Sequence, residues 1–223
     1  MTPLELTGRT RTHIAQHQNP QFAAHPDMAQ AYFKMRIAAK KEGIEIHPFS
    51  AFRDFGSQLK IWNNKYLGKR PLYSKDGKEL EHASLSKPEL INTILMWSAL
   101  PGASRHHWGT EVDVIDRAAI DENHHVELLP HEFSEGGVFQ KMNSWLNNHM
   151  NDFGFFRPYG IFQGGVNTEP WHLSFNPISS IALNDLSIDV IAKAIQDEEV
   201  LGKDYILENL ESIYSQYIIN ISM

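Results

Sequence analysis

The pattern of apolar and polar residues along the chain predicts helices and short strands in mixed order. Residues 26–42 carry apolar side chains at helical spacing and stop at Gly43, which predicts a helix. Residues 44–52 alternate in the manner of a strand. Further helices are predicted over residues 54–66, 86–100 and 138–150, and further strands over residues 112–115, 153–156, 161–162 and 171–175.

Two terminal segments lie outside this central pattern. Residues 1–25 are predicted to form an irregular or briefly helical arm. Beyond Pro177, two helical segments are predicted at about 185–198 and 203–219. We therefore expect one domain over residues 26–177, preceded by the arm and followed by a helical extension, residues 178–223, that packs on it.

Composition and charge exclude several classes of protein. With 223 residues, of which 42% are hydrophobic, the chain is long enough to bury a sizeable core. Its 20 basic and 27 acidic residues argue against a protein that binds nucleic acid through phosphate contacts. No stretch approaches the roughly 20 apolar residues of a membrane span, and residues 1–20 lack the apolar core of a secretory signal. We expect a soluble protein without nucleic-acid or membrane partners, cytoplasmic as written, with a periplasmic or released form left open.

Candidate chemistry is concentrated in two short segments. Residues 104–113 read Ser-Arg-His-His-Trp-Gly-Thr-Glu-Val-Asp, and residues 169–172 read Glu-Pro-Trp-His. The chain has no cysteine, but zinc also binds imidazole nitrogen and carboxylate oxygen, and a catalytic zinc site uses three protein ligands. The sequence therefore offers His106, Asp113 and His172 as metal ligands, with Glu169 left over as a base.

Neighbouring residues offer alternatives to this set. His107 competes with His106, and Asp116 competes with Asp113. Gly109 allows the turn that would bring His106 and Asp113 together. Glu111 is expected to face solvent on an alternating strand. A second histidine cluster, His124, His125 and His131, lies in a polar stretch that is interpreted as a solvated loop, and Tyr159 is a weaker candidate to reach the site from a turn.

Taken together, these motifs resemble the signature of the LAS metallopeptidases, and within them the VanY-like D-alanyl-D-alanine carboxypeptidases. The similar elements are Ser-x-His-x-x-Gly-x-x-x-Asp, then Glu-x-x-His, here with Trp before the His. Upstream, Ser50-Ala51-Phe52-Arg53 and Gln58 are similar to the family's Ser-Gly-Tyr-Arg segment with its downstream Gln. The chain departs from the pattern in two places, with Phe52 for the usual Tyr and Glu111 for a usually small residue.

The resemblance implies an α+β fold, with a small antiparallel sheet flanked by helices, and one zinc ion per chain. His106, Asp113 and His172 would bind the zinc, and Glu169 would act as the base. Arg53 would bind the substrate near its C-terminal carboxylate, with Gln58 and Ser104 helping to position it. The structural alternative for Arg53 is an ion pair with Asp54 or another acidic residue at the surface.

The function implied is removal of the terminal D-alanine from peptidoglycan stem peptides or their precursors, by water that the metal activates. Two alternatives stay within enzymes on the same scaffold, a peptidoglycan endopeptidase of the phage-lysin type and a D,D-dipeptidase. A third is a zinc-binding module without enzymatic activity. Glu169 argues against that module, because a structural zinc site has no use for a base.

Overall fold

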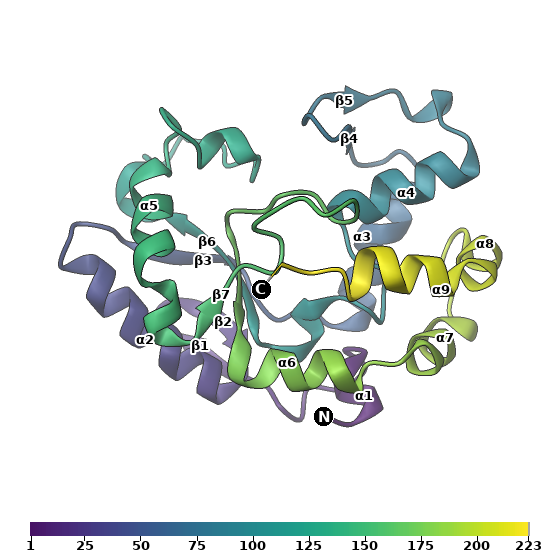
Figure 1. The fold of residues 1–223 in the computed structure, drawn as a ribbon, viewed down its shortest axis with the longest axis horizontal. Helices are drawn as coiled ribbons and strands as arrows, with labels where there is room; N and C mark the ends of the chain where they lie inside the picture. The colour runs from purple at the N-terminus through teal and green to yellow at the C-terminus, as the bar shows by residue number, and fades with distance from the viewer. Residues whose placement is uncertain (223) are drawn as a thin grey trace.

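A four-stranded antiparallel sheet lies at the centre of the structure, which is a computed structural model describing residues 1–222 (Figure 1). The order of the strands in space is β3-β6-β8-β7. This arrangement of a small antiparallel sheet with surrounding helices confirms the predicted α+β class. The strands are β3 (Ile46–Ser50), β6 (Glu111–Asp116), β7 (Phe155–Phe156) and β8 (His172–Phe175).

Helices form two groups, with α2 (Pro26–Lys40) and α5 (Gln140–His149) on one side of the sheet and most of the others on the opposite side (Figure 1). The first group, α2 and α5, packs with the strands into a hydrophobic cluster, here called the sheet cluster. The second group forms a separate helical cluster with few strand residues. Its members are α3 (Phe55–Tyr66), α4 (Lys87–Trp97), α6 (Asn176–Asp185), α7 (Ile188–Gln196), α8 (Lys203–Glu208) and α9 (Leu210–Ile213), which continues into a π-helical turn, Tyr214–Ile218.

Local signals explain where the main helices begin. Asp54 caps α3, with its carboxylate accepting a hydrogen bond from the backbone N–H of Ser57 at 2.7 Å. Ser86 and Glu89 form a capping box at the start of α4, whose second residue is Pro88. The structure thus confirms the predicted helices at 26–42, 54–66, 86–100 and 138–150, with ends that differ by a few residues.

The shorter elements connect this framework. A small hairpin, β4 (Leu72–Tyr73) and β5 (Glu79–Leu80), stands at the edge of the molecule next to α4 (Figure 1). It contains the turn at Lys75-Asp76-Gly77-Lys78. Single 3₁₀ turns occupy His82–Ser84, Arg105–Trp108, Arg117–Ala119, Pro130–Glu132 and Met150–Phe153.

The prediction for residues 1–25 was only partly right, because the brief helix is present but a hairpin that was not predicted follows it. A short helix, α1 (Pro3–Leu6), is followed by a hairpin of β1 (Ala15–Gln18) and β2 (Gln21–Ala24). Burial of Phe22 and Ala24 joins this hairpin to the sheet cluster. The sequence hides β1 because its four residues, Ala-Gln-His-Gln, present no apolar alternation.

Two other segments also differ from prediction. Ile161 and Phe162 form no strand, and Ile161 is exposed in a loop. The helix α6, which starts at Asn176 directly after β8, was not predicted, whereas α7 confirms the predicted segment at about 185–198 and α8 with α9 confirms the one at about 203–219. Proline is well tolerated in the first helical turn, where its missing N–H would have no partner.

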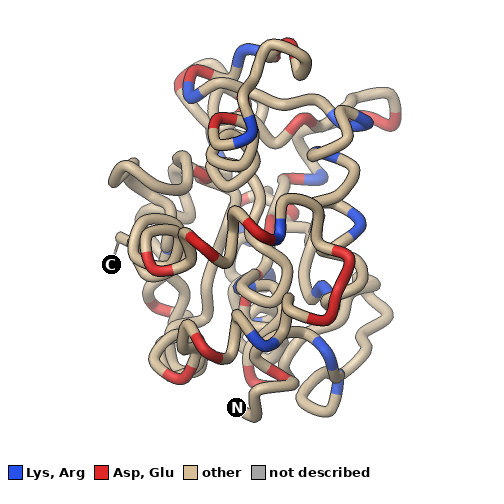
Figure 2. The backbone as a smooth tube through the Cα atoms, turned by 90° about the vertical axis from the view of Figure 1, so that its right-hand side faces the viewer, with Lys and Arg blue, Asp and Glu red and all other residues tan. Residues whose placement is uncertain are grey.

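The last part of the described chain returns to the centre of the molecule (Figure 1). Tyr217 and Ile218 join the helical cluster, and Ser222 accepts a hydrogen bond from the backbone N–H of Gly160 at 3.1 Å. Within residues 1–222, none of the helices combines the length and the apolar character that crossing a bilayer requires. Figure 2 shows acidic and basic residues interspersed along the backbone.

Candidate metal centre

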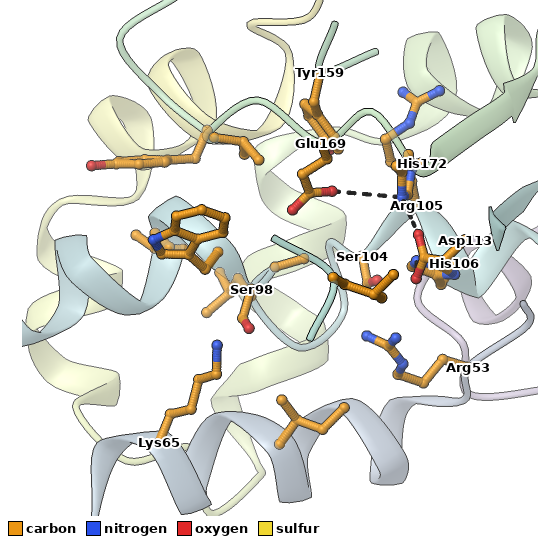
Figure 3. A pocket seen from close by; sticks show the side chains of 18 of the residues that line it. Arg53, Lys65, Ser98, Ser104, Arg105, His106, Asp113, Tyr159, Glu169 and His172 are labelled. Atoms are coloured by element: carbon orange, nitrogen blue, oxygen red, sulfur yellow. Dashed lines mark hydrogen bonds and ion pairs between the residues drawn. The ribbon is translucent and has the colours of Figure 1, made fainter. Parts of the chain in front are cut away.

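Strand pairing brings Asp113 and His172 together. In the β6–β8 register these two residues are directly opposite each other, so their side chains share one face of the sheet. His172 Nδ1 lies 2.9 Å from Asp113 Oδ1, and His106 Nε2 lies 3.4 Å from Asp113 Oδ2 (Figure 3). Each of the three side chains offers one ligand atom, and these atoms lie within 4.8 Å of one another. All three predicted ligands therefore face a common point.

The turn before β6 fixes the orientation of His106. Its Nδ1 lies 2.7 Å from the carbonyl oxygen of Ala51 and donates to it, because a carbonyl only accepts, which leaves Nε2 free to face Asp113. The turn depends on Gly109, whose φ is +66°. A Cβ there would lie 2.8 Å from the backbone nitrogen of His25, so no other residue fits without a shift.

The alternative metal ligands, His107 and Asp116, lie outside this group of three side chains. His107 is buried beneath the turn, where Nδ1 donates to the carbonyl of Arg53 at 2.6 Å and Nε2 accepts from the N–H of Gly102 at 3.1 Å. Asp116 accepts backbone hydrogen bonds from Glu45 and Ala118.

The histidines between residues 121 and 131 lie mostly at the surface. His131, for example, lies 3.7 Å from the exposed Glu127. Over residues 1–222, His106, Asp113 and His172 form the one group with metal-ligand spacing.

The prediction that Glu111 faces solvent was wrong. Its side chain is fully buried and accepts a hydrogen bond from His172 Nε2 at 2.9 Å, so that Nδ1 of this histidine faces Asp113. Ser174 also donates to Glu111, at 2.8 Å, and the buried guanidinium of Arg105 lies 3.3 Å away. Glu111 is buried because it lies two residues before Asp113 and so points to the same face of β6. That face is covered by protein.

Charge is closely balanced in this buried network. Burial alone would raise the pKa of Glu111, but the Arg105 guanidinium and the hydrogen bond from His172 outweigh it and lower this pKa to about 2. Burial alone would lower the pKa of His172, but its hydrogen bonds to the Asp113 and Glu111 carboxylates raise it to about 10. A metal ion that bound Nδ1 would therefore displace a proton from His172.

Glu169 lies beside the three candidate ligands. Its carboxylate is 3.7 Å from His172 Nδ1 and points into the pocket (Figure 3). Burial raises the pKa of Glu169 to about 7, against the opposing charge of His172. The loop that carries Glu169 is held by the buried Trp171, whose ring packs against Phe133 at 5.4 Å between centroids. The backbone N–H of Glu169 also donates to the carbonyl of Tyr159 at 2.9 Å. The centroid of the Tyr159 ring lies 5.2 Å from that of the His172 ring.

Arg53 enters the pocket from the loop between β3 and α3. Its guanidinium donates to Gln58 Oε1 at 2.7 Å and to Ser50 Oγ at 2.9 Å, while its backbone N–H donates to the carbonyl of His106 at 3.1 Å. The alternative ion pair with Asp54 is wrong, because Asp54 caps α3. Arg53 and its partner Gln58 are therefore fixed relative to the candidate ligands.

These side chains line a cavity of about 330 Å³ between the two hydrophobic clusters. Ser104 is buried on its wall, close to Arg53 (Figure 3). Lining residues that sequence reasoning missed include Lys65, Arg70, Arg105 and Tyr217. For Lys65 a signal existed, since it lies seven residues after Gln58 and so on the same face of α3. For Tyr217 there was none, because its place depends on how the C-terminal helices fold back.

The sequence of this chain is similar to a known protein family over most of its length. The sequence model of the D-alanyl-D-alanine carboxypeptidase family VanY matches residues 21–178. An uncharacterized protein of Haemophilus influenzae is 35% identical over 122 residues, which are 54% of this chain and 93% of that protein.

Two solved structures share the fold. VanYB in complex with D-alanine-D-alanine has a TM-score of 0.54 at 19% identity, covering 83% of this chain and 89% of that one. A mutant of the vancomycin resistance D,D-pentapeptidase VanY in complex with Zn(II) has a TM-score of 0.53 at 20% identity, covering 82% and 92%.

Proposed function

This chain belongs to the D-alanyl-D-alanine carboxypeptidase family VanY, and we propose that it is a zinc-dependent peptidase that removes the terminal D-alanine from peptidoglycan stem peptides or their precursors. The observation that carries the proposal is the convergence of two imidazoles and a carboxylate with a second carboxylate, that of Glu169, at one pocket. A site that only stabilised the fold would have no need of Glu169.

The donor set fits zinc. Two nitrogens and one oxygen converge from His106, His172 and Asp113, and the second nitrogen of each histidine is held by a hydrogen bond to another group. These side chains line a pocket, so an ion that they held would be reachable by solvent or substrate. A zinc ion held there would supply Lewis acidity, which polarises a peptide carbonyl and makes water a better nucleophile at neutral pH.

Glu169 and Arg53 would complete the reaction. The carboxylate of Glu169 would take a proton from the attacking water and deliver it to the nitrogen of the leaving D-alanine. A general base works best when its pKa is near the operating pH, and burial brings the pKa of Glu169 to about 7. The guanidinium of Arg53, fixed by Gln58 and Ser50, would pair with a carboxylate or oxyanion of the substrate.

Mass spectrometry of synthetic peptides ending in D-Ala-D-Ala, incubated with protein and zinc, tests this function. We expect the loss of one alanine mass. Hydrolysis of free D-Ala-D-Ala to two alanines, with no cleavage of longer peptides, would instead identify a dipeptidase. Cleavage confined to internal bonds of purified cell-wall fragments would identify an endopeptidase, and no cleavage of any of these substrates would overturn the proposal.

Removing the metal should reduce both activity and stability. We expect a chelator to abolish hydrolysis and added zinc to restore it. A ligand present at about 100 times its dissociation constant stabilises the folded state by about 2.7 kcal/mol, so zinc should also raise the midpoint of thermal unfolding. The control is His106→Ala, in which zinc should have a much smaller effect. An equal rise in both proteins would show that the ion binds elsewhere.

A further inference from the structure

Three basic side chains on one side of the pocket have no acidic partner. Arg53, Lys65 and Arg70 all line the cavity, and none of them forms an ion pair within residues 1–222. Another basic residue of the same pocket, Arg105, does have an acidic partner, Glu111, at 3.3 Å. Acidic residues outnumber basic ones in this chain, 27 to 20. The gathering of three unpaired cations at one pocket therefore favours an anionic ligand.

The helix α3 sets the spacing between two of these cations. Gln58, Ile61 and Lys65 lie at helical spacing on the face that lines or supports the pocket. Gln58 holds Arg53 at one end, and seven residues at 1.5 Å rise place Lys65 roughly 10 Å further along the helix. Figure 3 shows the ammonium group of Lys65 pointing across the pocket towards Ser98, well apart from Arg53.

The surroundings of Lys65 leave its charge available to a ligand. Its ammonium group donates no hydrogen bond to the described residues. The carboxylate that acts on its charge, Glu169, lies beyond ion-pair distance. Burial lowers the pKa of Lys65 to about 8, as expected for an ammonium group with little water and no counter-ion. Arg70 also lines the pocket and is exposed.

We propose that Lys65, with Arg70 at the rim, binds a second carboxylate of the peptide substrate, in addition to the group that Arg53 binds. This inference rests on the proposed peptidase function and narrows it to peptides with an acidic group near the scissile bond. An extended peptide rises about 3.3 Å per residue, so roughly 10 Å corresponds to about three residues. Substrates with that acidic group are selected over short neutral ones.

Paired peptides test the inference. Each pair ends in D-Ala-D-Ala and carries either glutamate or glutamine at one of the three preceding positions. Since hydrogen bonds to charged groups contribute about 1.5–3 kcal/mol, we expect the best glutamate peptide to have a KM at least about tenfold lower than its glutamine partner. Lys65→Gln should bring this ratio close to one by raising KM for the glutamate peptide alone. Lys65→Arg should preserve it.

Lys60→Gln is the matched control, because Lys60 is exposed on the same helix and does not line the pocket. It should leave the ratio unchanged. Calorimetric binding of both peptides to zinc-loaded Glu169→Gln protein, with and without Lys65→Gln, measures the same preference without hydrolysis. If peptides bind with this preference but are never cleaved, the subsite stands and the peptidase proposal fails. If Lys65→Gln weakens both peptides equally, or the parent protein shows no preference, the subsite proposal is overturned.

Discussion

Glu169→Gln is expected to reduce kcat/KM for D-alanine release by about 10²–10⁴-fold, the usual contribution of a general base. The amide keeps the size of the carboxylate but cannot take a proton from water. The neighbouring contacts of the loop, in particular the burial of Trp171 and the backbone hydrogen bond to Tyr159, do not involve the Glu169 side chain. The variant should therefore fold and bind metal as the parent protein does.

The measurement is the initial rate of D-alanine release, with circular dichroism and zinc content recorded on the same samples. Glu127→Gln provides a matched control, because Glu127 also lines the pocket but is half exposed and lies outside the ligand group. We expect that control to retain activity within a few-fold. A Glu169→Gln protein with near-parental activity would remove Glu169 from the reaction.

Replacing Glu111 with alanine should cause the largest loss of stability. Glu111 is the buried carboxylate that accepts from His172 and Ser174 and neutralises Arg105. Removing one partner of a buried ion pair leaves the other charge uncompensated and typically lowers the free energy of unfolding by about 3–5 kcal/mol. The same change removes the acceptor that holds His172 with Nδ1 facing the pocket. Zinc affinity should therefore also fall.

Urea unfolding at neutral pH and zinc titration measure these two effects. Glu111→Gln keeps an acceptor oxygen and should lose less stability than Glu111→Ala. The surface comparison is Glu45→Ala, because Glu45 is half exposed and 4.0 Å from Arg36, a pair expected to contribute at most about 1 kcal/mol. Equal losses for the two alanine variants would contradict the buried role of Glu111.

The sequence was sufficient for the main helices, the sheet strands and the convergence of the site. Amphipathic spacing and capping residues are local signals, so the helices at 26–42 and 54–66 could be predicted. The spacing of His106, Asp113 and His172 within the family-like motifs predicted that they would meet. The β6–β8 register pairs Asp113 with His172, and the turn before β6 adds His106. Their roles as zinc ligands stay predictions for the metal-binding experiments to test.

What the sequence did not reveal depends on contacts between distant segments. Glu111 alternates with buried valines, which favoured a solvent-facing position, yet the opposite face of β6 is covered by Arg105, His172 and Ser174. No local pattern distinguishes a solvent face from a face covered by other polar residues. The same limit applies to the N-terminal hairpin. Its polar strand β1 pairs with β2, and β2 packs on the sheet cluster through the buried Phe22.

The pocket is lined from both hydrophobic clusters, and this division has a consequence for inhibitor design. The candidate metal ligands belong to the sheet side, whereas Lys65 and Tyr217 belong to the helical side. A compound that coordinates the metal and also binds residues of the helical side would link the sheet side to the helical side. Such a compound should reduce local opening and slow amide hydrogen exchange on both sides. A simple chelating fragment should slow amide exchange on the sheet side alone.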